Sequence, residues 1–296
     1  MGSVKKGFIK TIWLNSKLEM KLKNDSIFEK IGQTVSLNLM LVKDFNKLNV
    51  FSGEDLLDID KCIHEIRKSL KSISAILFLF EFQFDQALYV NWKFNIKSLA
   101  KQYEIVREHF IYLQILSKID NELKDIEKGD LAEIRNQLES KYNHILLNNF
   151  IGEETIRNWN EAILKIIEAI QNLHINSDLK LLKRRLLKSY QKTNKLFEKL
   201  SLNSSTDEFH QFRKCCKRLY FQQVAFNRLG FEKNSKQNKK LYKLTEYLGK
   251  EHDLNLFYQY LSFNFTILSQ LSRSYFNRRI RKLRKNILMV YPQINY

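Results

Sequence analysis

The sequence predicts an all-α protein. Only one proline and eight glycines occur in 296 residues, so few positions interrupt a helix. Apolar residues recur with helical periodicity along nearly the whole chain, and no alternating strand pattern persists. No glycine-rich loop follows a strand, which argues against dinucleotide-binding and P-loop folds.

Short polar clusters separate the predicted helices. In the first half, the periodicity predicts helices over residues 27–49, 54–83, 92–119, 120–146 and 153–175. In the second half, it predicts helices over residues 178–200, 205–229, 235–249, 251–264 and 267–289. The clusters also supply helix-capping side chains, and the predicted N-caps are Ser52, Ser177 and either Ser204 or Ser205.

Positive charge is concentrated in the second half of the chain. The formal net charge is +18. Residues 1–150 carry 22 Lys and Arg against 20 Asp and Glu, whereas residues 151–296 carry 28 against 12. A one-sided excess predicts a surface that binds anions, and nucleic acid, an anionic membrane and a phosphate polymer all fit it.

The cysteines and the N-terminal sequence predict a cytoplasmic protein. Cys62, Cys215 and Cys216 form no CxxC motif, and the adjacent pair is unsuited to an ordinary disulfide, which favours a reducing compartment. The first residues contain no apolar run typical of a signal peptide, and no apolar stretch reaches about 18 residues, the length that indicates a transmembrane helix.

An internal repeat is the strongest feature of the sequence. The segment IHEIRKSLK at residues 63–71 recurs as FHQFRKCCKR at residues 209–218. A second element follows each copy, because Arg107-Glu108 begins 43 residues after His64 and His252-Asp253 begins 42 residues after His210. Duplication at this length predicts two similar helical bundles rather than a solenoid of short repeats.

Each copy of the repeat places its cations on one helix face. Positions i, i+3, i+4 and i+7 share a face, and they are occupied by His64, Arg67, Lys68 and Lys71 in the first copy and by His210, Arg213, Lys214 and Lys217 in the second, with Arg218 next to them. Apolar residues occupy the opposite face in both copies. A solvated basic face is the ordinary interpretation of such a stripe. The duplication, the scarcity of balancing acids and the histidine that opens each copy favour a polyanion site instead.

Two further basic runs are candidates for the same surface. Lys183, Arg184 and Lys188 follow near-helical spacing in the helix that opens the second half, and Arg281 and Arg284 belong to a cluster in the last helix. The last helix also fits a solvated helix end or a membrane-surface or RNA-binding segment.

The duplicated HxxRKxxK helices, each followed by a Leu-Gly-x-x-Arg-Asp-like element, resemble the CHAD family, the conserved histidine α-helical domain. The resemblance spans roughly residues 30–290, and FHQFRKCCKRLYF and LGKEHDLNLF in the second half match the family pattern best. The second element of the first half, at residues 103–108, departs from it, and Ser74 stands where another basic residue is common. No triphosphate tunnel domain, often fused to this family, is indicated.

The resemblance implies two pseudo-symmetric antiparallel helical bundles that face each other across a basic groove or pore. We expect an N-terminal extension at 1–26, a first bundle at 27–175 and a second at 176–296. It also implies inorganic polyphosphate as the ligand and an association with polyphosphate granules. Arg107 and Asp253 match the second element, and we interpret Asp253 as a structural partner of a motif cation. With the cations named above, Arg107 completes the predicted binding set.

We expect a binding protein rather than an enzyme, without cofactor or metal. No cluster of His, Cys and carboxylates surrounds either motif histidine in the sequence, and we expect each histidine to donate to a phosphate oxygen. The alternatives are a general nucleic-acid or anionic-surface binder and a scaffold that uses the basic C-terminal half. Specific nucleic-acid binding is not expected, because the aromatic residues near the motifs fall mostly on the apolar side.

Overall fold

The structure is a computed structural model that describes residues 53–120, 122, 128–148, 153–171, 179–228, 235–264 and 270–294. The predictions for residues 1–26 and 27–49, and the predicted N-caps Ser52 and Ser177, lie outside these ranges. The all-α prediction is confirmed, since the described residues form helices and short connections without a strand.

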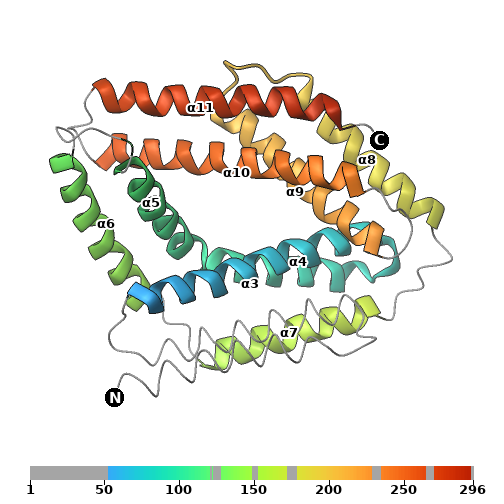
Figure 1. Ribbon diagram of the computed structural model, residues 1–296. Coiled ribbons are helices and arrows are strands. Elements are labelled where there is room, and N and C mark those ends of the chain that lie inside the picture. Colours follow the sequence, from blue (N-terminus) through green and yellow to red (C-terminus); the bar gives the residue numbers. More distant parts are fainter. Residues whose placement is uncertain are drawn as a thin grey trace.

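The helices follow the chain in the order shown in Figure 1. The first half contains α3 (Gly53–Phe80), the 3-10 helix η1 (Glu81–Gln83), α4 (Gln86–Gln102), α5 (Glu104–Asp120), α6 (Lys128–Asn148) and α7 (Glu153–Gln171). The second half contains α8 (Leu179–Phe197), α9 (Thr206–Arg228), α10 (Ser235–Asn264), α11 (Gln270–Val290) and the 3-10 helix η3 (Tyr291–Gln293).

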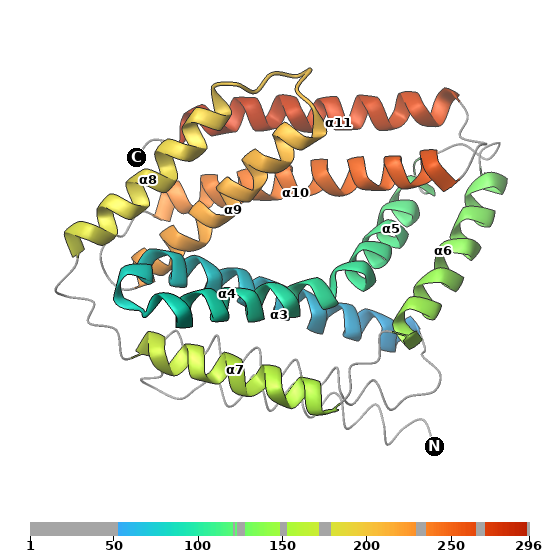
Figure 2. The ribbon, with the colours of Figure 1, turned by 180° about the vertical axis from the view of Figure 1, so that it is seen from behind.

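Four helices close a ring of pairwise contacts. Helix α3 packs on α9, α9 on α10, α10 on α5, and α5 on α3. Both ribbon views show these four helices around the middle of the molecule (Figures 1 and 2). The other helices lie outside the ring: α11 runs along α10 on the side away from α3, α7 packs against α4, α6 against α5, and α8 against α9 and α3.

Two hydrophobic clusters hold the helices together. The larger one combines buried residues of both halves, including Ile66 and Ile73 of α3 with Phe209, Phe212 and Leu219 of α9, each at most 1% exposed. The smaller one joins α5 and α6 to the second part of α10 and to α11. The opposite apolar faces of the two motif helices therefore form a shared core, and the division into bundles at 27–175 and 176–296 stays a prediction.

The predicted start of α9 is confirmed at Ser205. The Glu208 backbone N–H donates to Ser205 Oγ at 3.2 Å, and the Ser205 backbone N–H donates to Glu208 Oε2 at 2.7 Å. This reciprocal pair is a capping box, which satisfies two backbone donors that the first helical turn leaves unpaired. It fixes the register at which the second motif begins.

The single helix predicted over 92–119 is wrong. Helix α4 begins earlier, because Asp85 accepts hydrogen bonds from the backbone N–H groups of Ala87 and Leu88 at 3.0 Å each. It then ends at Tyr103, whose φ of −93° and ψ of 8° leave the helical region, and α5 follows. The Tyr103 side chain is 4% exposed, so this break accompanies burial of the tyrosine in the core.

The two helices predicted over 235–249 and 251–264 are one helix, α10. Glycine in a helix interior is less favourable than alanine by about 1 kcal/mol, and the stabilisation from tertiary contacts can offset a cost of this size. Glu251, two residues after Gly249, is 2% exposed and accepts a hydrogen bond from Arg284 of α11, so the helix makes tertiary contacts directly after the glycine.

Candidate anion-binding site

The two motif helices bring lysines from distant parts of the chain together. Lys217 of α9 lies close enough to Lys71 of α3 to lower the affinity of Lys71 for a proton. Desolvation and then Lys217, Arg67 and Arg213 lower the pKa of Lys71 to about 7, although this side chain keeps accessible surface. Desolvation and Arg213 lower the pKa of Lys217 to about 8. Like charges thus face each other across the α3–α9 contact.

We call Arg67, Lys71, Arg213 and Lys217 the central cations. Three of them have no carboxylate within ion-pair distance in the described part of the chain, and the fourth, Arg67, has only Glu104 at 3.7 Å. Arg67 also donates to the backbone carbonyl of Ala100 at the end of α4. The Nε atom of Arg213 is buried without a hydrogen-bond partner among the described residues. The cluster therefore holds donors and positive charge in excess of its own acceptors.

The remaining motif cations lie at the edges of this cluster. Lys68 is exposed and approaches Glu65 on its own helix at 3.3 Å. Lys214 is exposed on α9. Arg218 is exposed as well, and its guanidinium lies 5.1 Å from the ring centroid of Phe78 on α3, so it links the two motif helices.

The motif histidines occupy different environments. His210 lies against His252 of α10, with 3.2 Å between their Nδ1 atoms and 4.6 Å between ring centroids. Burial and then Arg213 lower the pKa of His252 to about 3, and burial followed by Lys214 lowers the pKa of His210. At 3.2 Å one ring donates to the other, so the accepting Nδ1 carries no proton. On α3, burial and Arg107 lower the pKa of His64 to about 4.

The second elements of the repeat follow on α5 and α10. Arg107 of α5 binds the carboxylate of Asp60, a residue of α3 that is 5% exposed. Burial raises the pKa of Asp253 on α10, while Arg213 and Lys217 oppose that rise. Asp253 therefore lies near the central cations without an ion pair to any of them among the described residues, so its role as a partner stays a prediction, and Arg107 is already engaged by a carboxylate of its own chain.

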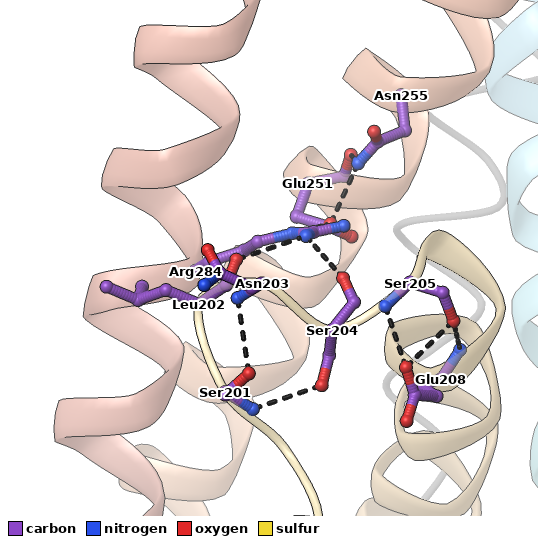
Figure 3. Close-up of polar contacts among 9 residues, drawn as sticks. All are labelled: Ser201, Leu202, Asn203, Ser204, Ser205, Glu208, Glu251, Asn255 and Arg284. Atoms are coloured by element: carbon purple, nitrogen blue, oxygen red, sulfur yellow. Dashed lines mark hydrogen bonds and ion pairs between the residues drawn. The ribbon is translucent and has the colours of Figure 1, made fainter.

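Arg284 lies in a buried network outside the cluster (Figure 3). Its Nε donates to Glu251 Oε1 at 2.8 Å, and its Nη1 donates to the carbonyl of Ser204 at 2.6 Å. The guanidinium stacks 4.3 Å from the ring centroid of Phe209, and Asn255 donates to the same Glu251 oxygen at 2.8 Å. With its donors occupied in this way, Arg284 joins α11, α10 and the turn before α9, and we leave it out of the candidate site.

The other cations predicted from the basic runs lie on the outer helices. Lys183, Arg184 and Lys188 are exposed on α8, and Arg281 is exposed on α11. Neither helix belongs to the ring, and α11 lies beyond α10 as seen from α3 (Figure 1). These four cations therefore lie on helices outside the ring, whereas the motif residues lie on the ring helices α3 and α9.

Sequence reasoning missed two side chains that shape the site. His252 was recognised only as part of the second element and not as a neighbour of His210. Its place in that element was the signal that could have identified it. Arg185, next to the predicted Arg184, donates to the Phe78 carbonyl at 2.8 Å and binds Glu81, so it joins α8 to the end of α3. No sequence spacing distinguished the half-buried Arg185 from its exposed neighbour Arg184.

Metal ligands and membrane spans were also sought among the described residues. No group of three or more His, Cys, Asp and Glu side chains there is arranged to hold a metal ion. The three cysteines are free, with Cys62 and Cys216 buried. No described helix is both long and apolar enough to cross a membrane.

Comparison with known proteins decides the family. The sequence model of the CHAD domain matches residues 44–262, which include both motifs and both second elements. The chain belongs to the CHAD family. Its fold resembles the crystal structure of the CHAD domain from the plant Ricinus communis, with a TM-score of 0.52 at 14% identity over 92% of this chain and 90% of that one. No curated protein matches the sequence.

Proposed function

We propose that this CHAD protein binds inorganic polyphosphate at the central cations, without catalysing its turnover. The observation that carries the proposal is the packing of motif helix α3 on motif helix α9, which brings Lys217 close enough to Lys71 to lower its pKa in the ligand-free protein. A chain of phosphates lying between α3 and α9 replaces this repulsion with charge-assisted hydrogen bonds.

The carboxylates near the cluster support binding rather than hydrolysis. Asp60 is held by Arg107, and Glu251 is held by Arg284 and Asn255. A carboxylate that acts as a general base must be free to accept a proton from water in the site. Asp60 and Glu251 are therefore not free to act as a general base, and we interpret Asp253, whose pKa Arg213 and Lys217 lower against desolvation, as a counter-charge to the central cations.

The aromatic residues of α9 favour a ligand without bases. Phe209 and Phe212 are fully buried, and Tyr220 lies 5.7 Å from Tyr242 and 5.3 Å from Phe221, measured between ring centroids. Binders of single-stranded nucleic acid present aromatic faces on which bases stack. The motif faces instead present cations, which recognise phosphate alone. Association with polyphosphate granules belongs to the same proposal.

The test is a titration with long-chain polyphosphate and, in parallel, with single-stranded RNA of matched charge. It is run at about 150 mM salt, where screening beyond about 8 Å suppresses diffuse attraction. The variant Lys71→Gln/Lys217→Gln removes two central cations, and Lys183→Gln/Lys188→Gln removes two exposed cations of α8 as a control of equal net charge.

We expect the wild-type protein and the α8 control to bind polyphosphate alike and RNA much more weakly. We expect the Lys71→Gln/Lys217→Gln variant to lose polyphosphate affinity by at least about tenfold, while its circular dichroism and melting curve show a folded protein. Equal binding of both polymers by all three proteins would instead establish a general anionic-surface binder.

A further inference from the structure

Gly249 occupies an unfavourable position in the helix that carries the second element. It lies in the interior of α10, far from both of its ends at Ser235 and Asn264. Glycine is destabilising in a helix interior relative to alanine, because its backbone loses more conformational freedom on folding. A glycine at such a position calls for a reason beyond helix formation.

Packing within the protein does not supply that reason. Apart from its own helical turn, a Cβ atom built on Gly249 meets no heavy atom of the described residues within 4 Å, which means that it projects into open space. The backbone there is that of a continuous helix, so no left-handed conformation requires glycine. Alanine fits the ligand-free protein without displacing any neighbour.

The open space lies on the side of α10 that faces the central cations. Glu246, His252 and Asp253 are three or four residues from Gly249 and share its helix face. His252 contacts His210 of α9. The carboxylates of Glu246 and Asp253 both oppose the lowering of the Lys217 pKa, which places Lys217 near the same face.

We propose that the bound polyanion passes in contact with the backbone of α10 at Gly249, and that this residue keeps the space for it open. The inference rests on the proposed function and deepens it. The central cations of α3 and α9 attract the phosphates, and α10 closes the ring beside them. A side chain at position 249 extends into the space through which a phosphate chain reaches Lys217.

A single substitution at position 249 distinguishes an effect on protein stability from an effect on ligand binding. Gly249→Ala improves helix propensity and meets no neighbour, so we expect the melting temperature to rise by about 2 °C. The same methyl group reduces the space for the ligand. Because overpacking is destabilising, we expect polyphosphate affinity to fall by about tenfold. Gly249→Leu extends further, and we expect a loss of about a hundredfold.

Two controls make the experiment decisive. Ser262→Ala lies 13 residues along α10 at an exposed position, about 20 Å away at the helical rise, and we expect no change in affinity. The Lys71→Gln/Lys217→Gln variant reports whether the central cations bind polyphosphate at all. A folded Gly249→Ala protein with wild-type affinity, beside a defective Lys71→Gln/Lys217→Gln variant, would overturn the role of Gly249 and leave the proposed function intact.

Size dependence distinguishes lost space from a stiffened helix. Equal losses of affinity in Gly249→Ala and Gly249→Leu would mean that helix flexibility, and not the open volume, is what glycine contributes, and the proposal would be wrong. Wild-type affinity in every variant, including Lys71→Gln/Lys217→Gln, would overturn the proposed function itself.

Discussion

Two lysines of the site lie where desolvation and neighbouring cations disfavour their protonated, charged form. Lys71 and Lys217 have pKa values lowered to about 7 and about 8, first by desolvation and then by neighbouring cations. Near neutral pH a fraction of these lysine side chains is therefore deprotonated and uncharged in the ligand-free protein. An anion between the two lysines reverses the effect and raises both pKa values.

This linkage predicts a pH dependence of polyphosphate binding. Below about pH 6 both lysines are protonated in the free protein, so affinity is greatest there. From about pH 6 to 9 the free protein loses these protons, first from Lys71 and then from Lys217, while the complex retains them, so affinity falls and binding takes up protons. Calorimetry in two buffers with different ionisation enthalpies measures that uptake.

The matched variant replaces the two lysines with residues that do not titrate. Lys71→Arg/Lys217→Arg stays charged throughout this range, because the guanidinium group is always protonated in practice. We expect its affinity to be nearly independent of pH between 7 and 9. Wild-type binding that is equally flat, or that releases protons, would contradict the linkage.

The sequence predicts that each motif histidine, His64 and His210, donates to a phosphate oxygen, and desolvation lowers the pKa of both rings and of their neighbour His252. The pKa values of His64 and His252 are lowered to about 4 and about 3, so neither is charged at neutral pH in the free protein. The motif predicted that these rings stand beside cations. It did not predict how far desolvation, together with Arg107 for His64 and Arg213 for His252, lowers these pKa values, because both arginines come from other helices.

At the scale of elements, helix faces were easier to predict than helix ends. The apolar and cationic faces of α3 and α9 follow from spacing alone, since helical periodicity fixes which residues share a side. The break at Tyr103 and the continuity of α10 past Gly249 depend on tertiary contacts, which local sequence does not contain. The same limit applies to Arg284, whose neighbours in the sequence are exposed cations.

The buried ion pair between α10 and α11 predicts a large effect on stability. Glu251 is 2% exposed, and Arg284→Ala leaves its carboxylate without the guanidinium that offsets desolvation. Removing one partner of a buried pair costs about 3–5 kcal/mol of unfolding free energy. Urea denaturation measures this loss, and Arg281→Ala, an exposed neighbour on α11, is the control with an expected change within about 0.5 kcal/mol. Similar unfolding midpoints for the two variants would show that the network contributes little.

At the scale of the whole molecule, the half of the chain that holds the excess positive charge is not the only half that forms the site. The second half of the sequence holds nearly all of the excess positive charge, yet the central cations come equally from α3 in the first half and α9 in the second. They meet because the apolar faces of the two helices join one core. Composition predicted a polyanion partner, but the packing of distant segments determines which of the 50 Lys and Arg residues lie together.

This distinction predicts how binding responds to salt. Each cation that contacts a phosphate adds counterion release, so the logarithm of the binding constant falls with the logarithm of salt concentration with a slope that grows with the number of contacts. We expect Lys217→Gln to reduce the magnitude of that slope by about one, and Arg281→Gln on the outer helix to leave it unchanged. Titrations of polyphosphate over a series of salt concentrations measure both slopes. If Arg281→Gln lowers the slope as much as Lys217→Gln does, the ligand is held by the basic surface as a whole, and the ring of α3, α9, α10 and α5 is not its specific site.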